Sequence, residues 1–321
     1  MNRRWFLVAS LCAAVAWRST FAAPKANARV GYLDLASDSD GELLYREFVE
    51  AMQRHGFVER RNLRIERRSA DGRRERLRSL AAELNVAKLD VIVATSTDAA
   101  LNAKFAAPHT PIVFVVSGDP VLEGLVKSLS RPQGKLTGVT TRGEDLSAKR
   151  LEILKEAFPR LRTVAVVGST LSVARASFDE AARQLQLAVL RFPAHDLDEY
   201  RDTAAKISRS VADAILVVED ADAIVGLRSI VLLMMITRRP VMFNADIFVE
   251  NGGLMAFGVN LRQRYRRVAE LVVRILEGAR PADIPVEQPV SYELVVNRRA
   301  AEINGITLPD QLLLRADRVI K

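Results

Sequence analysis

The chain has 321 residues, of which 49% are hydrophobic, and it carries a formal net charge of +8 and a single cysteine, Cys12. A chain of this length can build two domains, each with its own hydrophobic core. One cysteine excludes an internal disulfide and a thiolate metal site, and the scattered histidines (His55, His109 and His195) do not suggest a histidine site, so we expect no bound metal.

The first 23 residues have the features of a secretory signal peptide. A basic start (residues 2–4) is followed by an apolar stretch (residues 5–16) and then by small residues before Pro24. The sequence Arg3-Arg4-Trp5-Phe6-Leu7 also fits the twin-arginine pattern, so export by either the Sec or the twin-arginine route is expected. The apolar stretch is too short to span a bilayer. We expect a mature protein that is soluble in the periplasm.

From residue 29 onward, predicted strands and helices alternate. Short runs rich in β-branched residues, such as Val91-Ile92-Val93-Ala94, are typical of strands that are buried on both faces of a parallel sheet. The first half of the chain predicts strands over residues 30–33, 63–67, 91–94, 112–116 and 136–139, and helices over residues 41–55, 73–85, 99–106 and 121–129.

The second half of the chain repeats this order. It predicts strands over residues 164–167, 187–191, 214–218, 240–243 and 254–257, and helices over residues 146–158, 173–185, 198–208, 223–237 and 261–277. The longest apolar run of the mature chain, residues 230–236, is expected to be a core helix. An extended segment over residues 286–296 and a tail broken by Pro309 suggest that the chain recrosses between the halves. The pattern predicts two doubly wound α/β domains with parallel sheets that face each other across a cleft.

Two predicted strands of the first half end in polar loops. Ser96 and Thr97 follow the strand over residues 91–94, and Ser117-Gly118-Asp119-Pro120 follows the strand over residues 112–116. Ligands of parallel α/β sheets bind beyond the carboxyl ends of the strands, where helix N-termini supply free N–H donors. Ser96, Thr97, Ser117 and Asp119 are therefore candidate ligand contacts, although the same residue types also cap helices. Pro120 favours the first position of a helix, with Asp119 as its N-cap.

Polar residues also end two predicted strands of the second half. Glu219 follows the strand over residues 214–218, where its carboxylate could either hold a ligand ammonium or hydroxyl group or cap the next helix. Asn244 follows the strand over residues 240–243 and is a further candidate contact. The pair Glu144-Asp145 is better explained as the N-cap of a helix.

No catalytic signature is present in the sequence. It lacks the dinucleotide-binding G-x-G-x-x-G after its first strand, the phosphate-binding G-x-x-x-x-G-K-[ST] and the nucleophile motif G-x-S-x-G. We therefore expect neither catalytic residues nor a cofactor.

Arginines crowd one short segment of the chain: Arg60, Arg61, Arg64, Arg67, Arg68, Arg73, Arg74, Arg76 and Arg78. No aromatic residue lies between Phe57 and Phe105, whereas nucleic-acid-binding surfaces usually combine arginines with aromatic rings. We expect no binding to nucleic acid and interpret the cluster as a solvated strand edge and helix face. A docking role of this cluster stays open.

A series of short motifs extends over nearly the whole mature chain. They are Arg29-Val30-Gly31-Tyr32, Gly56-Phe57-Val58-Glu59-Arg60-Arg61-Asn62-Leu63, Leu80-Ala81-Ala82-Glu83-Leu84, Asp90-Val91-Ile92-Val93-Ala94, Pro111-Ile112-Val113, Gly118-Asp119-Pro120, Gly124-Leu125-Val126, Leu136-Thr137-Gly138, Lys149-Arg150-Leu151-Glu152, Gly252-Gly253-Leu254-Met255 and Leu312-Leu313-Leu314-Arg315-Ala316-Asp317. In their order and spacing these motifs resemble the ABC transporter substrate-binding proteins of the tryptophan/tyrosine-transporter-like group.

The resemblance implies a type I periplasmic-binding fold, in which hinge crossings join two α/β lobes that clamp a ligand. It implies an N-terminal lobe of residues 29–141 and 258–283 and a C-terminal lobe of residues 142–257 and 284–321. It also implies a monomer that delivers a small solute, amino-acid-like or another small organic molecule, to an inner-membrane ABC permease driven by a separate ATPase. The ligand contacts that it implies come from the strand-end loops: Ser96, Thr97, Ser117, Asp119, Glu219 and Asn244.

The second half of the chain departs from the family pattern at two strand ends. Gly168-Ser169 stands where the family usually has Asn-Pro, and Glu219-Asp220 stands where it usually has Pro-Asp. An exported receptor that reports ligand occupancy to a sensor kinase or a chemoreceptor would use the same binding chemistry, so this alternative stays open. A periplasmic α/β enzyme is a third alternative, which the missing catalytic motifs disfavour.

Overall fold

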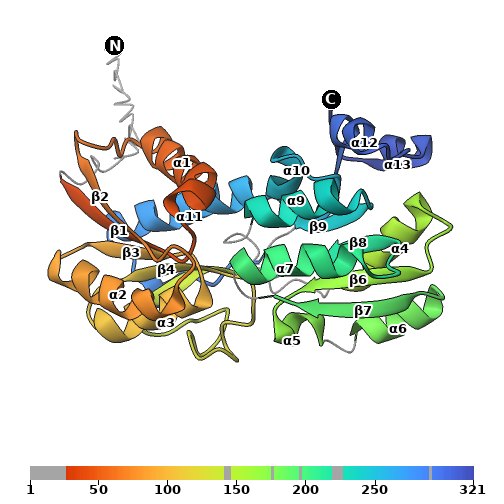
Figure 1. The fold of residues 1–321 in the computed structure, drawn as a ribbon. Coiled ribbons are helices and arrows are strands. Elements are labelled where there is room, and N and C mark those ends of the chain that lie inside the picture. Colours follow the sequence, from red (N-terminus) through yellow and green to blue (C-terminus); the bar gives the residue numbers. More distant parts are fainter. Residues whose placement is uncertain (1–26, 141–145, 175–176, 195–196, 219–226, 289–290) are drawn as a thin grey trace, which may run out of the picture.

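The computed structural model describes residues 27–140, 146–174, 177–194, 197–218, 227–288 and 291–321. These residues form two α/β lobes, each built on its own sheet (Figure 1). The predicted signal peptide, the candidate Glu219 and the pair Glu144-Asp145 lie outside the described residues. Within the described ranges, no helix has the length and apolarity that crossing a membrane requires.

The N-terminal lobe contains a parallel sheet with the strand order β2-β1-β3-β4-β5. Its strands are β1 (Ala28–Asp34), β2 (Leu63–Ser69), β3 (Val91–Ala94), β4 (Ile112–Val116) and β5 (Leu136–Thr140). The helices α1 (Asp38–Arg54) and α11 (Leu261–Leu276) pack on each other, and α2 (Leu77–Val86), which follows a 3₁₀ turn over Arg74–Arg76, packs on α3 (Thr97–Ala106). Neighbouring residues of a strand point to opposite faces, so Tyr32 packs with Phe48 of α1 while Leu33 joins the core beneath α2 and α3.

The C-terminal lobe contains a sheet with the strand order β12-β11-β10-β9-β8-β6-β7. Its strands are β6 (Thr163–Gly168), β7 (Ala188–Pro193), β8 (Ala214–Val217), β9 (Val241–Ala245), β10 (Met255–Val259), β11 (Glu293–Asn297) and β12 (Arg318–Ile320). Its helices are α4 (Ser147–Ala157), α5 (Thr170–Val173), α6 (Ser177–Gln184), α7 (Leu197–Ser208), α9 (Leu227–Thr237), α10 (Asp246–Glu250), α12 (Arg298–Asn304) and α13 (Asp310–Arg315). Strand β11 runs antiparallel to β10, and the other described pairs are parallel.

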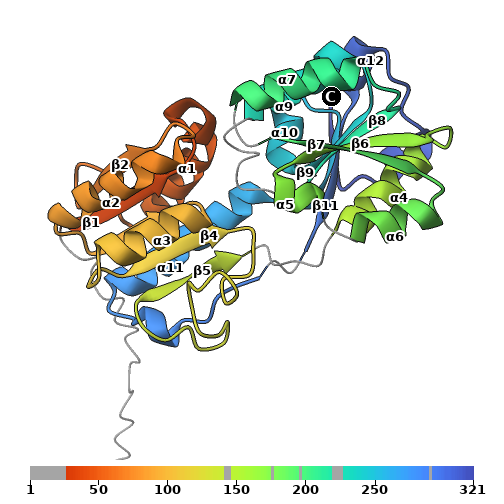
Figure 2. The same ribbon diagram turned by 60° about the horizontal axis from the view of Figure 1, so that its bottom comes forward.

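The chain passes between the two sheets after β5, between β10 and α11, and again between the short 3₁₀ helix Pro281–Asp283 and β11. Helix α11 therefore packs in the N-terminal lobe although it follows most of the C-terminal lobe in the sequence, as its light blue ribbon shows in Figure 2. The predicted fold class, two α/β domains with parallel sheets joined by hinge crossings, is confirmed.

The helix predicted over residues 121–129 is wrong, because these residues form turns. Only one helical turn begins, with the N–H of Glu123 donating to the carbonyl of Asp119. Gly124 then takes a left-handed backbone conformation (φ +72°), and the N–H groups of Leu125 and Val126 turn back to the carbonyl of Pro120. The reversal directs Leu125 and Val126 into the core of the N-terminal lobe.

Two other expectations differ from the structure in the C-terminal lobe, and one helix was not predicted. The helix predicted over residues 173–185 is replaced by α5 and α6, and the sequence did not reveal α10, which is too short to produce a helical period. The segment expected to be a core helix, residues 230–236, lies in α9, where Ile230 and Val231 are buried. Leu232, Met235 and Ile236 are 44%, 54% and 58% exposed, because α9 covers the lobe surface beside α7 instead of running through the core.

The crowded arginines lie in the turn before the edge strand β2, on β2, in the segment that leads to α2 and in α2 itself, and several pair with carboxylates. Arg64 lies 2.7 Å from Glu66 of the same strand, Arg68 lies 2.8 Å from Glu83 of α2, and Arg67 contacts α1. Ion pairs of this kind on a surface contribute little to stability and are compatible with the interpretation as a solvated face.

Candidate functional site

The strands β1 and β3 end side by side at one edge of the N-terminal sheet, and polar residues follow both. Asp34 ends β1 and accepts hydrogen bonds from the Thr95 hydroxyl at 2.7 Å and from the N–H of Ala36 at 3.1 Å. Ser96 is the N-cap of α3, where its Oγ accepts from the N–H of Ala99 at 3.1 Å. Asp34, Thr95 and Ser96 line a small cavity together with Tyr265 of α11. The structure thus places the predicted residue Ser96 beside a buried carboxyl group.

Burial raises the pKa of the Asp34 carboxyl group above its ordinary value, although the hydrogen bonds from Thr95 and Ala36 favour the ionised form. The folded protein therefore binds this proton more tightly than the unfolded chain. As the pH rises above about 4, ionisation of Asp34 lowers the free energy of unfolding until the pH passes the raised pKa. We expect Asp34→Asn, which keeps the accepting oxygen, to remove this loss.

Urea denaturation of both proteins at about pH 4 and about pH 7 measures the effect. Other carboxyl groups titrate equally in the two proteins, so the difference in their pH dependence isolates Asp34. An identical pH dependence of the free energy of unfolding would show that burial does not penalise the Asp34 carboxylate.

Ser117 and Asp119 lie in the loop that follows β4, and Thr97 of α3 lies beside this loop. The Thr97 hydroxyl donates to Oε2 of Glu123 at 2.9 Å, and Oδ1 of Asp119 accepts from the N–H of Val121 at 2.9 Å. Asp119 therefore caps a turn, although the helix expected after it does not form. Burial raises the pKa of Glu123, and the nearby Asp119 raises it further. These contacts bring Thr97 and the Asp119 loop together, and Ser117 lies half-buried in the same loop.

Asn244 is buried near the end of β9 in the C-terminal sheet. Its main-chain oxygen accepts from Nη2 of Arg150 at 3.3 Å, and Nε of the same arginine donates to the carbonyl of Phe257 in β10 at 2.6 Å. The side-chain Oδ1 of Asn244 is buried without a hydrogen-bond partner among the described residues. Since buried polar atoms are normally hydrogen-bonded, this oxygen is an acceptor that the described residues leave unsatisfied.

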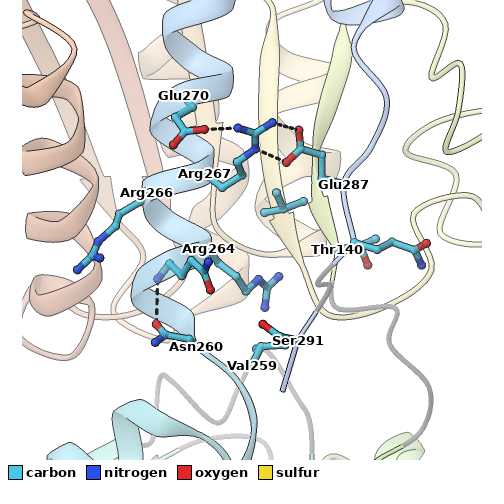
Figure 3. Close-up of a pocket in the computed structure, with 12 residues that line it drawn as sticks. Thr140, Val259, Asn260, Arg264, Arg266, Arg267, Glu270, Glu287 and Ser291 are labelled. Carbon is cyan, nitrogen blue, oxygen red and sulfur yellow. Dashed lines mark hydrogen bonds and ion pairs between the residues drawn. The ribbon is translucent and has the colours of Figure 1, made fainter. Parts of the chain in front are cut away.

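A larger cavity of about 580 Å³ lies beside the hinge (Figure 3). The end of β5, the first turns of α11 and the segment that leads to β11 line it, with the polar residues Thr140, Asn260, Arg264, Arg267, Glu270 and Glu287. The guanidinium group of Arg267 lies between the carboxylates of Glu270 and Glu287, with its Nη2 2.7 Å from Oε1 of Glu287. The candidates from the sequence that the structure describes do not line this cavity.

Two residues of the hinge cavity hold the loop after β4 through its backbone. Nη2 of Arg264 donates to the carbonyl of Val116 at 3.0 Å, and the hydroxyl of Thr140 donates to the carbonyl of Gly118 at 2.6 Å. The loop that carries Ser117 and Asp119 therefore adjoins the hinge cavity.

Sequence reasoning did not identify Asp34, Thr140 or Arg264. Asp34 could have been found by the rule that selected Ser96, because it also ends a buried strand. Arg264 could not, because it lies 148 positions from Val116 in the sequence and only the packing of α11 on the N-terminal sheet brings the two together.

Solved structures share this fold over nearly the whole chain. The ABC domain in complex with L-Trp from Streptococcus pneumoniae is 25% identical to this chain, with a TM-score of 0.78 over 91% of this chain and 100% of that chain. A conserved domain protein from Vibrio cholerae is 24% identical, with a TM-score of 0.81 over 91% of this chain and 99% of that chain.

Sequence comparison agrees with the structural similarity. A Tyrosine-binding protein of Clostridioides difficile (strain R20291) is 24% identical over 305 residues, which are 92% of this chain and 87% of that protein. The family model of the ABC transporter substrate binding proteins matches residues 37–320. This match covers both lobes and confirms the resemblance recognised in the sequence motifs. The chain belongs to the family of ABC transporter substrate binding proteins.

Proposed function

We propose that this chain is the periplasmic substrate-binding component of an ABC importer. After loss of residues 1–23 it acts as a monomer, closes its two lobes around a small solute and delivers the solute to an inner-membrane permease driven by a separate ATPase. It catalyses no reaction. The family match over residues 37–320 supports this proposal. One observation carries the proposal. Polar residues lie at the carboxyl ends of strands in both lobes, and hinge crossings join the two lobes.

In this proposal the N-terminal lobe comprises residues 29–141 and 258–283, and the C-terminal lobe comprises residues 142–257 and 284–321, except that residues 258 and 259 end β10 and stay with the C-terminal sheet. The segments between them act as hinges. A ligand favours the closed arrangement only by its additional affinity for that arrangement, so the solute must contact both lobes.

We propose an amino acid as the solute, with L-tryptophan and L-tyrosine as the first candidates. The Tyrosine-binding protein of C. difficile and the L-Trp complex from S. pneumoniae support this class. The free Oδ1 of Asn244 suits a ligand ammonium group, as do the carboxylates of Asp119 and of Glu219, which lies outside the described residues. Ser96, Thr97 and Ser117 offer hydroxyl groups from the N-terminal lobe.

A thermal-shift screen of the mature protein against amino acids tests this function. A true solute at about 100 times its dissociation constant should stabilise the folded state by about 2.7 kcal/mol, which raises the melting temperature by roughly 5 °C. The D-enantiomers of tryptophan and tyrosine are the matched controls, because they have the same groups in the wrong arrangement. Equal shifts with both enantiomers, or no shift with any amino acid, would contradict an amino acid site.

Calorimetry on Asp119→Asn locates the bound solute within the cleft. Asparagine caps a turn nearly as well as aspartate, so the melting temperature of the ligand-free protein should change little. If the Asp119 carboxylate contacts the solute ammonium group, the affinity should fall about tenfold or more. Equal affinities would assign Asp119 to the turn alone and direct the search to Asn244 and Glu219.

A further inference from the structure

Arg262 lies in the first turn of α11, directly after the chain has crossed from β10, and it contacts both lobes. Its Nη1 lies 2.9 Å from Oε1 of Glu47 in α1, which belongs to the N-terminal lobe. Its Nη2 lies 2.7 Å from Oε2 of Glu250 in α10, which belongs to the C-terminal lobe. A second bond, from Nε to the same oxygen at 2.9 Å, makes the contact with Glu250 a forked one.

Both carboxylates have another arginine partner within their own lobe. Nε of Arg266 lies 2.9 Å from Oε2 of Glu47, and Nη2 of Arg318 lies 2.9 Å from Oε1 of Glu250. The side chains of Glu47 and Glu250 are only 7% and 15% exposed. In this network of five residues, Arg262 alone joins one lobe to the other.

The two carboxylates of this network are largely buried, and at Glu47 the arginines more than offset the cost of burying the charge. Burial alone raises the pKa of Glu47, but hydrogen bonds from Arg266 and Arg262 hold that pKa below its ordinary value. By contrast, Arg228 of α9, which also reaches across to α1, lies 3.7 Å from Asp40 and is 71% exposed. At this distance, and with the arginine in solvent, that pair contributes little, although Asp40 is only 14% exposed.

We propose that Arg262 is a positioning residue that cross-links the two lobes and thereby sets how readily the cleft opens. Helices α1 and α11 pack on each other within one lobe, so the contact with Glu47 is retained when the hinge bends. Glu250 moves with the other lobe, so opening breaks the forked contact between Glu250 and Arg262. The cross-link and a bound solute therefore both favour the closed arrangement of the lobes.

The test compares Arg262→Gln with Arg266→Gln in the ligand-free protein. Arg262→Gln removes the cross-link, while Arg266 stays on Glu47 and Arg318 stays on Glu250, so neither carboxylate is left without a cation. Arg266→Gln is the matched control, because it takes the same charge from the same carboxylate but acts within one lobe. Glu250→Gln is a second variant that breaks the cross-link from the other side and leaves Arg262 on Glu47.

The readout is the distance between the lobes, measured by pulsed electron paramagnetic resonance. Spin labels are attached at Val86→Cys and Val211→Cys, two exposed positions in different lobes, in the chain without residues 1–23, which has no other cysteine. Arg262→Gln and Glu250→Gln should shift the distribution to longer distances and raise the ratio of open to closed molecules about fivefold or more. Arg266→Gln should match the parent. Salt at about 1 M, which shortens the Debye length to about 3 Å, should shift the parent more than Arg262→Gln.

An unchanged distribution in Arg262→Gln and Glu250→Gln would overturn the proposal. An equal shift in Arg266→Gln would also overturn it, because the effect would then come from the contact of α1 with α11. Circular dichroism of each variant establishes that it is folded. Since no solute is present, the result does not depend on the amino acid proposal, and a failed ligand screen would leave it standing.

Discussion

Replacing Gly258 by alanine is expected to lower the free energy of unfolding by about 3 kcal/mol. Gly258 lies in β10 where the register with β9 shifts, between the pairs Ala256–Phe243 and Val259–Ala245. A Cβ atom at this position would lie 1.8 Å from the main-chain oxygen of Asn244. A backbone atom cannot rotate away as a side chain can, so the two strands must separate. Urea denaturation measures the loss.

Gly31→Ala is the matched control for this substitution, because Gly31 also lies in a buried strand. Its added Cβ would lie 2.5 Å from Cδ1 of Leu89, the end of a flexible side chain that can turn aside. We therefore expect a smaller loss for Gly31→Ala than for Gly258→Ala. Similar losses in the two variants would show that contact with the backbone of Asn244 is not the cause.

Arg150→Met is expected to lower the free energy of unfolding by a similar amount, about 3 kcal/mol. Arg150 is 1% exposed and joins α4 to the carbonyls of Phe257 and Asn244 at the ends of β10 and β9. Methionine occupies a similar volume but donates no hydrogen bond, so both buried carbonyls lose this donor. Guanidinium chloride denaturation at constant pH is the measurement.

The neighbouring residue Lys149 provides the control for Arg150. It is exposed and pairs with Glu152 one turn along the same helix at 2.8 Å. Lys149→Met makes the same kind of change on the same helix, yet we expect a loss of less than about 0.5 kcal/mol. If the two methionine variants were equally stable, the hydrogen bonds of Arg150 would not support this edge of the sheet.

The parts of the fold that the sequence predicts correctly are those with strong local patterns. The β-branched runs of β3 and β4 are long enough, and buried enough, to be recognised as strands of a parallel sheet. The helix expected over residues 121–129 fails because Gly124 and the carbonyl of Pro120 reverse the chain, a choice that depends on where Leu125 and Val126 can be buried. The apolar segment over residues 230–236 fails because composition alone does not tell which side of a helix is covered.

In the candidate site, too, features that depend on local sequence are predicted and contacts between distant residues are not. The N-cap of Ser96 follows from a local rule and is found in the structure, whereas Asp119 caps a turn in place of the predicted helix. The contact of Arg264 with Val116 and that of Arg262 with Glu47 and Glu250 join distant parts of the chain. No local pattern encodes such pairs, because they depend on the packing of α11 in the N-terminal lobe, far from its neighbours in the sequence. Whether the six residues selected from the sequence contact a solute stays a prediction.

The late position of α11 in the sequence has a consequence for how the protein acquires its structure. Val268, Ala269 and Val272 of α11 are fully buried, and α11 contacts β3, β4 and β5, all of which are synthesised much earlier. Until α11 emerges from the ribosome, one face of the N-terminal sheet has no complete cover. Contacts between such distant segments slow folding and prolong the exposure of apolar surface. Residues 28–140 are therefore not expected to complete the N-terminal lobe by themselves. The nascent chain depends on α11, in its last third, to cover the sheet that its first half forms.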